Sequence, residues 1–108
     1  MGRALKRGEV RWYKFLHPDK NRPVVILTRD SAIQFLGEVT VAPVTTTIRD
    51  IPSEVYLDKS KDEMLQNCVV NLDHIQTVSK AKIGSLITSL SRQKMLELRS
   101  ALLFSLGF

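Results

Sequence analysis

Apolar residues gather along the chain in short runs, many of them alternating or β-branched, and turn-forming residues separate these runs. Runs of this length and composition are typical of β-strands with one or both faces buried. Pro, Gly, Asp and Asn stand between them, where the chain has to turn. The pattern predicts strands within GEVRWYKF (8–15), RPVVILT (22–28), EVTVAPVTT (38–46), SEVYL (53–57) and NCVVNLDHIQTVSK (67–80), the last interrupted at Asn71.

Prolines mark two special positions in these runs. Pro23 suits the start of a strand because it has no N–H to give to a ladder, and it pushes Arg22 into an extended conformation. Arg22 would then be a fixed guanidinium at a strand entrance, which is either an anion site or a solvated charge beside the strand. Pro43 predicts an edge, a bulge or a strand end nearby, which places the threonines 45–47 at a sheet margin.

Two polar segments between the strands carry weaker signals. RDSAIQFLG (29–37) predicts one helical turn, with Asp30 or Ser31 as the N-cap and Gly37 as the terminator. DKSKDEM (58–64) predicts a surface loop or one helical turn.

The last stretch of the chain has a helical period. SRQKMLELRSALLFSL (91–106) spaces its apolar residues as on a helix that begins at the N-cap Ser91 and ends near Gly107. Short strands followed by this helix predict a mainly β fold with α: a small, strongly twisted antiparallel sheet or open barrel that carries a C-terminal helix. The apolar arc is wider than the roughly 100° that one sheet face requires, and Phe104 falls outside it. The excess predicts a buried surface beyond the core of one chain, unless it simply meets more sheet.

Composition and charge narrow the class of protein. The chain has 108 residues, 44% of them hydrophobic and 25% charged, which suits one globular domain. Its net charge is +5 and its isoelectric point about 9.7, so a polyanionic partner is favoured, either nucleic acid or an acidic protein. No segment is apolar enough to cross a bilayer, and MGRALKRGEV lacks the hydrophobic region of a signal peptide. We therefore expect a cytoplasmic protein.

Several chemistries are disfavoured by missing motifs. The sequence has no Walker A, GxGxxG, CxxC or HExxH pattern, and its two histidines are far apart, so we expect no metal and no cofactor. Cys68, the single cysteine, has apolar neighbours that predict a buried strand thiol, and a catalytic cysteine is the lesser alternative. The candidates that remain are polar residues near strand ends: Lys14, His17, Arg22, Thr45, Thr46, Thr47, Arg49, Asp73, His74 and Gln76.

Five stretches, in this order, resemble the MazF/PemK-like toxins of bacterial type II toxin–antitoxin systems: KRGEVRW, RPVVIL, VTVAPVTTT, IPSEVYL and NLDHIQTVSKAKIG. The resemblance covers nearly the whole chain and implies a single MazF/PemK-like toxin domain over residues 1–108 with a small SH3-like open barrel. It implies a homodimeric, metal-independent mRNA interferase, which is a sequence-specific endoribonuclease that cuts single-stranded RNA. It also implies a cognate antitoxin, for which we expect an acidic tail that is disordered until it binds.

The resemblance assigns roles to individual residues. Arg22 matches the catalytic arginine of the family, and Thr45 matches its catalytic threonine or serine. A guanidinium can stabilise the charge that develops when a 2′-OH attacks phosphorus, and a hydroxyl can donate to a phosphoryl oxygen. His17 and Asp73 match a histidine and an aspartate of PemK-type members and are the candidate acid–base pair, whereas we expect His74 to be structural. RNA-binding candidates are Lys14, Lys20, Thr46, Thr47, Arg49 and Gln76.

The chain departs from the family pattern at two places, and other functions stay open. The first loop, LHPDKN (16–21), is short and has no glycine, and Asn71 stands where PemK-type members have an arginine. One alternative is a toxin of the same fold that grips and inhibits a protein such as DNA gyrase. The gyrase poisons lack the arginine and threonine pair that this chain has, which favours RNA. The other alternative is a non-catalytic nucleic-acid-binding barrel, for which the net charge alone would be sufficient.

Overall fold

The fold is mainly β, as the sequence predicts. The computed structural model describes residues 4–14 and 21–108. In these residues it has the strands β1 (Glu9–Lys14), β2 (Asn21–Ile26), β3 (Glu38–Thr45), β4 (Glu54–Leu57), β5 (Cys68–Asn71), β6 (Gln76–Ser79) and β7 (Ile83–Ser89), the α-helices α1 (Asp30–Ile33) and α2 (Arg92–Leu106), and the 3-10 helices η1 (Leu72–His74) and η2 (Lys80–Lys82).

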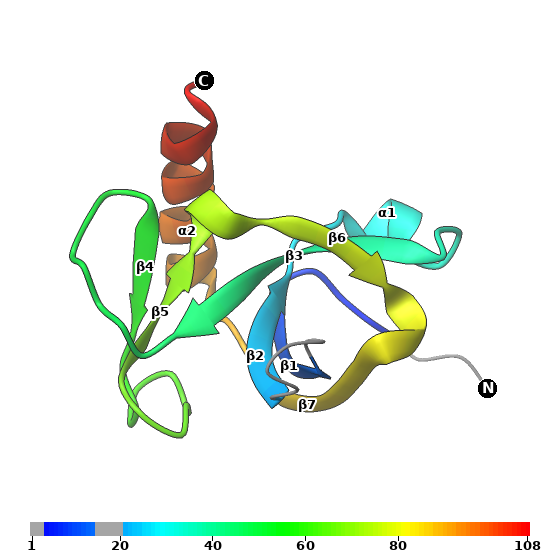
Figure 1. Cartoon of the computed structure of the whole chain (residues 1–108), viewed down its shortest axis with the longest axis horizontal. Helices are drawn as coiled ribbons and strands as arrows, with labels where there is room; N and C mark the ends of the chain where they lie inside the picture. The colour runs from blue at the N-terminus through cyan, green and yellow to red at the C-terminus, as the bar shows by residue number, and fades with distance from the viewer. Residues whose placement is uncertain (1–3, 15–20) are drawn as a thin grey trace.

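All strand pairs are antiparallel and form one twisted sheet in the order β4-β5-β3-β2-β1-β7, with β6 paired to β3 away from this path. β3 joins the β4–β5 part of the sheet to the part formed by β2, β1 and β7 (Figure 1). Its residues 38–41 pair with β6, and Val44 and Thr45 pair with β5. Pro43 lies between these two stretches, where the partner strand changes, so its missing N–H falls at the end of one ladder as expected.

Two buried clusters fill the two faces of the curled sheet. One cluster lies between the sheet and α2 and includes Val10, Val25 and Leu98. The other lies on the opposite face and includes Val24 and Ile26. Val24 and Val25 belong to different clusters because successive side chains of a strand point to opposite faces. β2 is therefore buried on both faces up to its start, where Arg22 and Asn21 are exposed.

α2 begins and ends where the sequence predicts. The Ser91 side chain accepts the Lys94 N–H at 3.2 Å, and Gly107 ends the helix in the left-handed conformation with φ of 79°. Figure 1 shows α2 standing beside β4, which it contacts. Only Leu98 and Ala101 of the helix are buried. An apolar surface remains exposed on it, formed by Leu96, Leu103, Phe104 and Leu106.

Two predictions about local structure are wrong or incomplete. α1 is capped by neither Asp30 nor Ser31: its N-cap residue is Arg29, and the Asp30 carboxylate instead accepts the Arg7 N–H at 2.7 Å. Gly37 does not end α1, because the helix stops at Ile33. β7 was not predicted as a strand, and it pairs with β1.

In the part of the chain that the structure describes, no helix is long and apolar enough to span a membrane.

Candidate functional site

Arg22 and Thr45 lie at neighbouring ends of two paired strands. The β2–β3 ladder ends at the pair Val24–Pro43, Arg22 and Thr45 each lie two residues beyond it, and both line the same hollows. Arg22 is exposed at the start of β2, and Thr45 is half-buried at the end of β3. Within the described ranges, no hydrogen bond or ion pair engages the Arg22 guanidinium. Its charge is therefore available to a ligand.

Two open hollows meet at this pair of residues. We call the first the tryptophan-side hollow; it has a volume of about 270 Å³. Its described lining residues are Trp12, Asn21, Arg22, Pro23, Val44, Thr45, Thr46, Met64, Leu65, Gln66 and Cys68. The second, the histidine-side hollow, has a volume of about 220 Å³. Its described lining residues are Arg22, Pro43, Val44, Thr45, Thr47, Arg49, Asn71 and His74. Arg22 and Thr45 line both, so they form the rim between the two hollows.

The Thr45 hydroxyl is oriented by its own turn. Its oxygen accepts the Thr47 N–H at 3.1 Å, which occupies one acceptor position of the hydroxyl. A hydroxyl has one hydrogen and two lone pairs, so Thr45 can still donate its hydrogen. A phosphoryl oxygen placed between Arg22 and Thr45 would thus find a cation and a neutral donor.

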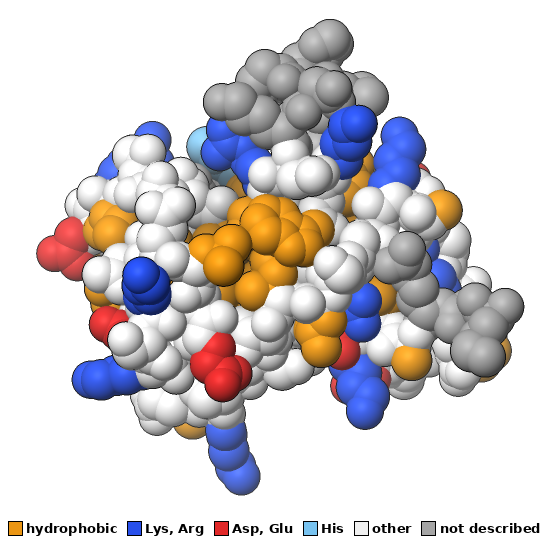
Figure 2. Space-filling model, turned by 90° about the horizontal axis from the view of Figure 1, so that it is seen from below, with side chains coloured by type: hydrophobic (Ala, Val, Ile, Leu, Met, Phe, Trp, Pro, Cys, Tyr) orange, Lys and Arg blue, Asp and Glu red, His pale blue; other side chains and the backbone are white. Residues whose placement is uncertain are grey.

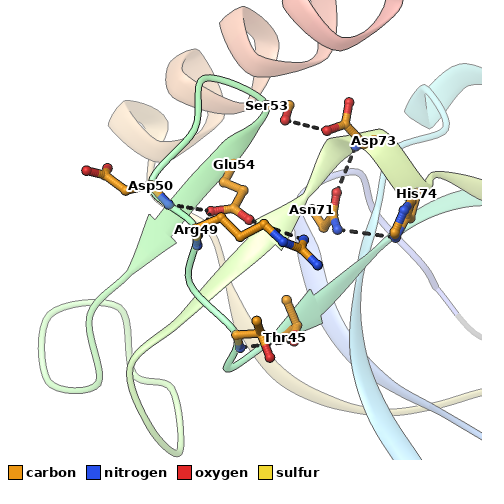
Figure 3. A network of polar contacts seen from close by, with 9 residues as sticks. Thr45, Arg49, Asp50, Ser53, Glu54, Asn71, Asp73 and His74 are labelled. Carbon is orange, nitrogen blue, oxygen red and sulfur yellow. Dashed lines mark hydrogen bonds and ion pairs between the residues drawn. The ribbon is translucent and has the colours of Figure 1, made fainter.

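A buried carboxylate holds the segment that follows β3 (Figure 3). Glu54, at the start of β4, accepts the backbone N–H groups of Arg49 and Asp50 through Oε1, each at 3.0 Å. Its second oxygen lies 3.9 Å from Nη1 of Arg49, and its side chain is 2% exposed. Asp50 has a φ of 56°, a left-handed conformation that Asp tolerates better than most residues. Glu54 therefore stabilises a tight turn that carries Arg49.

A second set of polar contacts shapes η1. Ser53, next to Glu54, donates its hydroxyl to the Asp73 carboxylate. The Asn71 side-chain oxygen accepts the Asp73 N–H at 2.9 Å, and the Asn71 amide nitrogen lies 3.3 Å from Nδ1 of His74. Figure 3 shows Asp73 pointing toward Ser53, with Asn71 between Asp73 and His74. Ser53, just before β4, and Glu54, its first residue, thus hold η1 and the Arg49 turn.

The structure brings together some of the predicted residues and not others. Arg22, Thr45, Thr47 and Arg49 line the histidine-side hollow, and Thr46 lines the tryptophan-side hollow. Asp73, Gln76 and Lys14 line neither hollow. Asp73 instead binds Ser53, Gln76 pairs with Val41 in the sheet, and Lys14 is exposed at the end of β1. His17 and Lys20 lie outside the described residues. The roles assigned to all of these residues stay predictions.

Several residues of the site were missed in the sequence. Trp12, Asn21 and Gln66 line the tryptophan-side hollow, and His74, expected to be structural, lines the other one. Trp12 carried a usable signal, because a half-buried aromatic residue beside a basic strand end suits base stacking. Glu54 carried only a weak sequence signal, which is its position as a carboxylate at the start of an alternating strand. Its burial depends on contacts that the pattern does not contain.

Cys68 lines the tryptophan-side hollow but is poorly suited to nucleophilic catalysis. It is buried, as predicted, and burial raises the pKa of its thiol to about 11. The thiol is therefore protonated near neutral pH, and the thiolate is the reactive form. In the described part of the chain, His, Cys, Asp and Glu side chains form no group of three or more that could hold a metal ion.

Charged side chains surround an apolar centre on one face of the molecule. Figure 2 shows hydrophobic side chains gathered in the middle of this face, with Lys and Arg side chains and some Asp and Glu side chains around them. Single-stranded nucleic acid carries a charged backbone and flat apolar bases, and such a surface offers contacts to both.

Comparisons with known proteins agree with this geometry. The family model described as PemK-like, MazF-like toxin of type II toxin-antitoxin system matches residues 6–106. The chain is 41% identical over 96 residues to a protein named probable endoribonuclease MazF5 from Mycobacterium tuberculosis strain H37Rv, covering 89% of this chain and 87% of that protein.

Solved structures show the same fold. The Mycobacterium tuberculosis toxin MazF-mt6 is similar with a TM-score of 0.83 and 33% identity, over 93% of this chain and 97% of that one. A mycobacterial endoribonuclease solved in complex with its cognate antitoxin has a TM-score of 0.86 and 27% identity, over 97% of each chain. These matches show that the chain belongs to the PemK-like, MazF-like toxins of type II toxin–antitoxin systems.

Proposed function

We propose that this protein is an endoribonuclease toxin that cuts single-stranded RNA without a metal ion and is neutralised by a cognate antitoxin. The observation that carries the proposal is that the Arg22 guanidinium, which no described residue engages, and the hydroxyl of Thr45 together line two open hollows. A relative 41% identical is named a probable endoribonuclease, and a structural neighbour is described in complex with its cognate antitoxin. Both support the proposal.

The proposed reaction is an attack within the RNA itself. The 2′-OH attacks the adjacent phosphorus, a new P–O2′ bond forms, and the P–O5′ bond breaks. The products are a 2′,3′-cyclic phosphate and a free 5′-OH. Arg22 stabilises the negative charge on the phosphoryl oxygens in the transition state, and Thr45 donates its hydroxyl hydrogen to one of them. Both groups are already in place before the substrate arrives, so little reorganisation is needed.

Proton transfer requires a further group, because arginine keeps its proton at ordinary pH. Asp73 and His17 are the acid–base pair that the family resemblance suggests. Asp73 accepts a hydrogen bond from Ser53 and lines neither hollow, so we assign it the smaller part, the shaping of η1. His17 is proposed, on the resemblance alone, to accept the proton of the 2′-OH, and the leaving 5′ oxygen takes a proton from water.

The proposed assembly is a homodimer, which the exposed apolar surface of α2 supports. Leu96, Phe104 and Leu106 are each more than half exposed. Exposed apolar residues that gather on one helix suit a contact with a second copy better than contact with water. The antitoxin is proposed to bind with an acidic tail that competes with RNA for the Arg22 and Thr45 rim, so its inhibition should weaken as salt rises.

One experiment tests the proposed activity against its alternatives. Purified protein is incubated with a long single-stranded RNA in EDTA, and the 5′ ends of the fragments are sequenced and chemically typed. We expect discrete cuts, 5′-OH ends on the downstream fragments and cyclic phosphates on the upstream ones. Intact RNA would contradict the activity and favour a toxin that grips a protein or a barrel that only binds nucleic acid. A 5′-phosphate would contradict attack by the 2′-OH.

Sedimentation and salt titration test the proposed assembly. A monomer at micromolar concentration would refute the homodimer. An antitoxin peptide that binds equally well when the rim charges are reversed would refute the competition.

A further inference from the structure

The histidine-side hollow has a second basic wall, beyond the rim formed by Arg22 and Thr45. Arg49 lines it from the segment that follows β3, and His74 lines it from the end of η1. None of its described lining residues is an Asp or Glu. A hollow bordered by two guanidinium groups, an imidazole and threonine hydroxyls has many hydrogen-bond donors and, among its described lining residues, no carboxylate. These are the properties of an anion site.

The buried carboxylate of Glu54 determines where Arg49 can lie. One oxygen accepts two backbone N–H groups of the turn, at 3.0 Å each. The other oxygen has no hydrogen-bond partner among the described residues, and the nearest cation is Nη1 of Arg49 at 3.9 Å. A buried, unsatisfied carboxylate oxygen attracts that cation strongly. Since 55% of the Arg49 side chain is still exposed, its remaining N–H groups can donate to a ligand.

The contacts of Asn71 determine the tautomer of His74. The Asn71 oxygen is occupied by the Asp73 N–H, so its amide nitrogen faces Nδ1 of His74. An amide nitrogen can only donate, and Nδ1 must therefore accept. In the neutral imidazole the hydrogen is then on Nε2. His74 thus offers an N–H donor to an anion in the hollow.

We propose that this hollow binds a second phosphate group of the RNA through Arg49 and His74, with Glu54 as the positioning residue for Arg49. The inference rests on the proposed function, which supplies RNA as the ligand. Arg22 and Thr45 hold the scissile phosphate and line the same hollow, so the second phosphate is the neighbour one linkage from the cut. Successive phosphates of one strand match two anion sites that share a rim.

A phosphate-by-phosphate map of binding tests the proposal. The probe is a short 2′-deoxy oligonucleotide with the sequence of a mapped cut, which cannot be cleaved because it lacks the attacking hydroxyl. One methylphosphonate linkage, which removes a single phosphate charge, is placed at each position in turn. For the wild-type protein we expect roughly tenfold weaker binding when the linkage is at the cut or at one neighbouring position, the scale of a hydrogen bond to a charged group.

Substitutions of Arg49 and His74 test whether these residues form the second phosphate site. In Arg49→Ala, the penalty at the neighbouring linkage should disappear while the penalty at the cut remains. His74→Ala should reduce the neighbouring penalty, and His74→Gln, which keeps an N–H donor, should restore part of it. An Arg49→Ala map that equals the wild-type map would overturn the proposal.

Glu54→Gln separates positioning from folding. Glutamine keeps an oxygen that can accept the two N–H groups of the turn but has no charge. We expect a nearly unchanged melting temperature and a neighbouring-linkage penalty reduced to roughly threefold, because Arg49 keeps its charge and loses its fixed place. Glu97→Gln is the matched control: it removes a carboxylate 3.5 Å from Lys94 on α2 and should leave the map unchanged.

Two results contradict the inference in different ways. If Glu54→Gln keeps the wild-type map, Glu54 is not the positioning residue. RNA cleavage by the wild-type protein in EDTA is measured in parallel. Cleavage together with an Arg49-independent map would overturn this inference alone, whereas no cleavage would overturn the proposed function and this inference with it.

Discussion

Two arginines line the histidine-side hollow, and the chain holds them in different ways. Arg22 is placed by the backbone ladder of β2, whose start is stiffened by Pro23, and the described residues do not engage its guanidinium. Arg49 is placed by a turn that contains the left-handed Asp50 and is held by the buried Glu54 carboxylate. One arginine is positioned by strand pairing, the other by a single side chain.

The two arginines differ in how much positive charge they present and in how their positions are set. The strand-held arginine presents a cation that no described carboxylate pairs with, which suits the stabilisation of a dianionic transition state. The carboxylate-held arginine shares its charge with Glu54, so it contributes less electrostatic stabilisation and more geometry. Damage to the first should therefore appear in the rate of cleavage, and damage to the second in stability and binding.

The largest expected effect is that of Arg22→Ala. We expect a loss of about 10²-fold or more in kcat, the scale observed when a preorganised donor to an oxyanion is removed. The melting temperature should stay unchanged, because Arg22 is exposed and packs little. Steady-state cleavage of an RNA reporter and a thermal melt measure both quantities. Arg22→Lys should also be poor, since an ammonium lacks the planar fork. Near-wild-type cleavage by Arg22→Ala would end the proposed mechanism.

The second effect concerns the carboxylate-held region. Glu54→Ala leaves the Arg49 and Asp50 N–H groups without their acceptor, and we expect the free energy of unfolding to fall by about 2 kcal/mol. Urea denaturation measures the change. Glu97→Ala on α2, whose carboxylate is 40% exposed, is the control and should change it by less than about 0.5 kcal/mol. Equal stability of the Glu54 and Glu97 variants would remove the contrast between the two regions.

Thr45→Ala should reduce cleavage less than Arg22→Ala does. The hydroxyl donates to a phosphoryl oxygen most strongly in the transition state, so we expect kcat to fall by roughly tenfold with a smaller rise in KM. Thr45→Ser keeps the hydroxyl and should retain most of the activity. If RNA affinity falls in parallel with the rate, Thr45 is a binding residue, and the assignment of its hydroxyl to the transition state is wrong.

The smallest expected effect is that of Pro23→Ala. Strand pairing with β1 continues on both sides of this position, so the ladder should hold Arg22 without the proline ring. We expect a loss of about 0.4–1 kcal/mol in stability, from the greater freedom of the unfolded chain, and cleavage close to that of the wild type. Calorimetry and the RNA reporter measure these. A loss of cleavage as large as that of Arg22→Ala would show that the ring, rather than the ladder, positions the guanidinium.

Local chemistry explains which parts of the fold were predictable. The limits of α2 were correct because Ser91 and Gly107 act on backbone groups within four residues of themselves. The cap of α1 was wrong because the Asp30 carboxylate binds the N–H of Arg7, 23 residues earlier in the chain. β7 was missed because its place in the sheet depends on its pairing with β1. The two strands approach closely at Gly84, where a Cβ atom would lie 3.1 Å from the Trp12 carbonyl oxygen.

The sequence by itself determined the positions of the strands in the first half of the chain and the C-terminal helix, and its resemblance to a family singled out Arg22 and Thr45 as site residues. These follow from short-range patterns and from a motif order that spans the chain. Only the tertiary structure decided that Glu54 is buried beneath Arg49, that His74 lines the hollow, and that Asp73 turns to Ser53. The physical reason is that burial and long-range hydrogen bonds depend on residues that are distant in the sequence. A local pattern of apolar and polar residues does not show which distant residues will pack against a side chain.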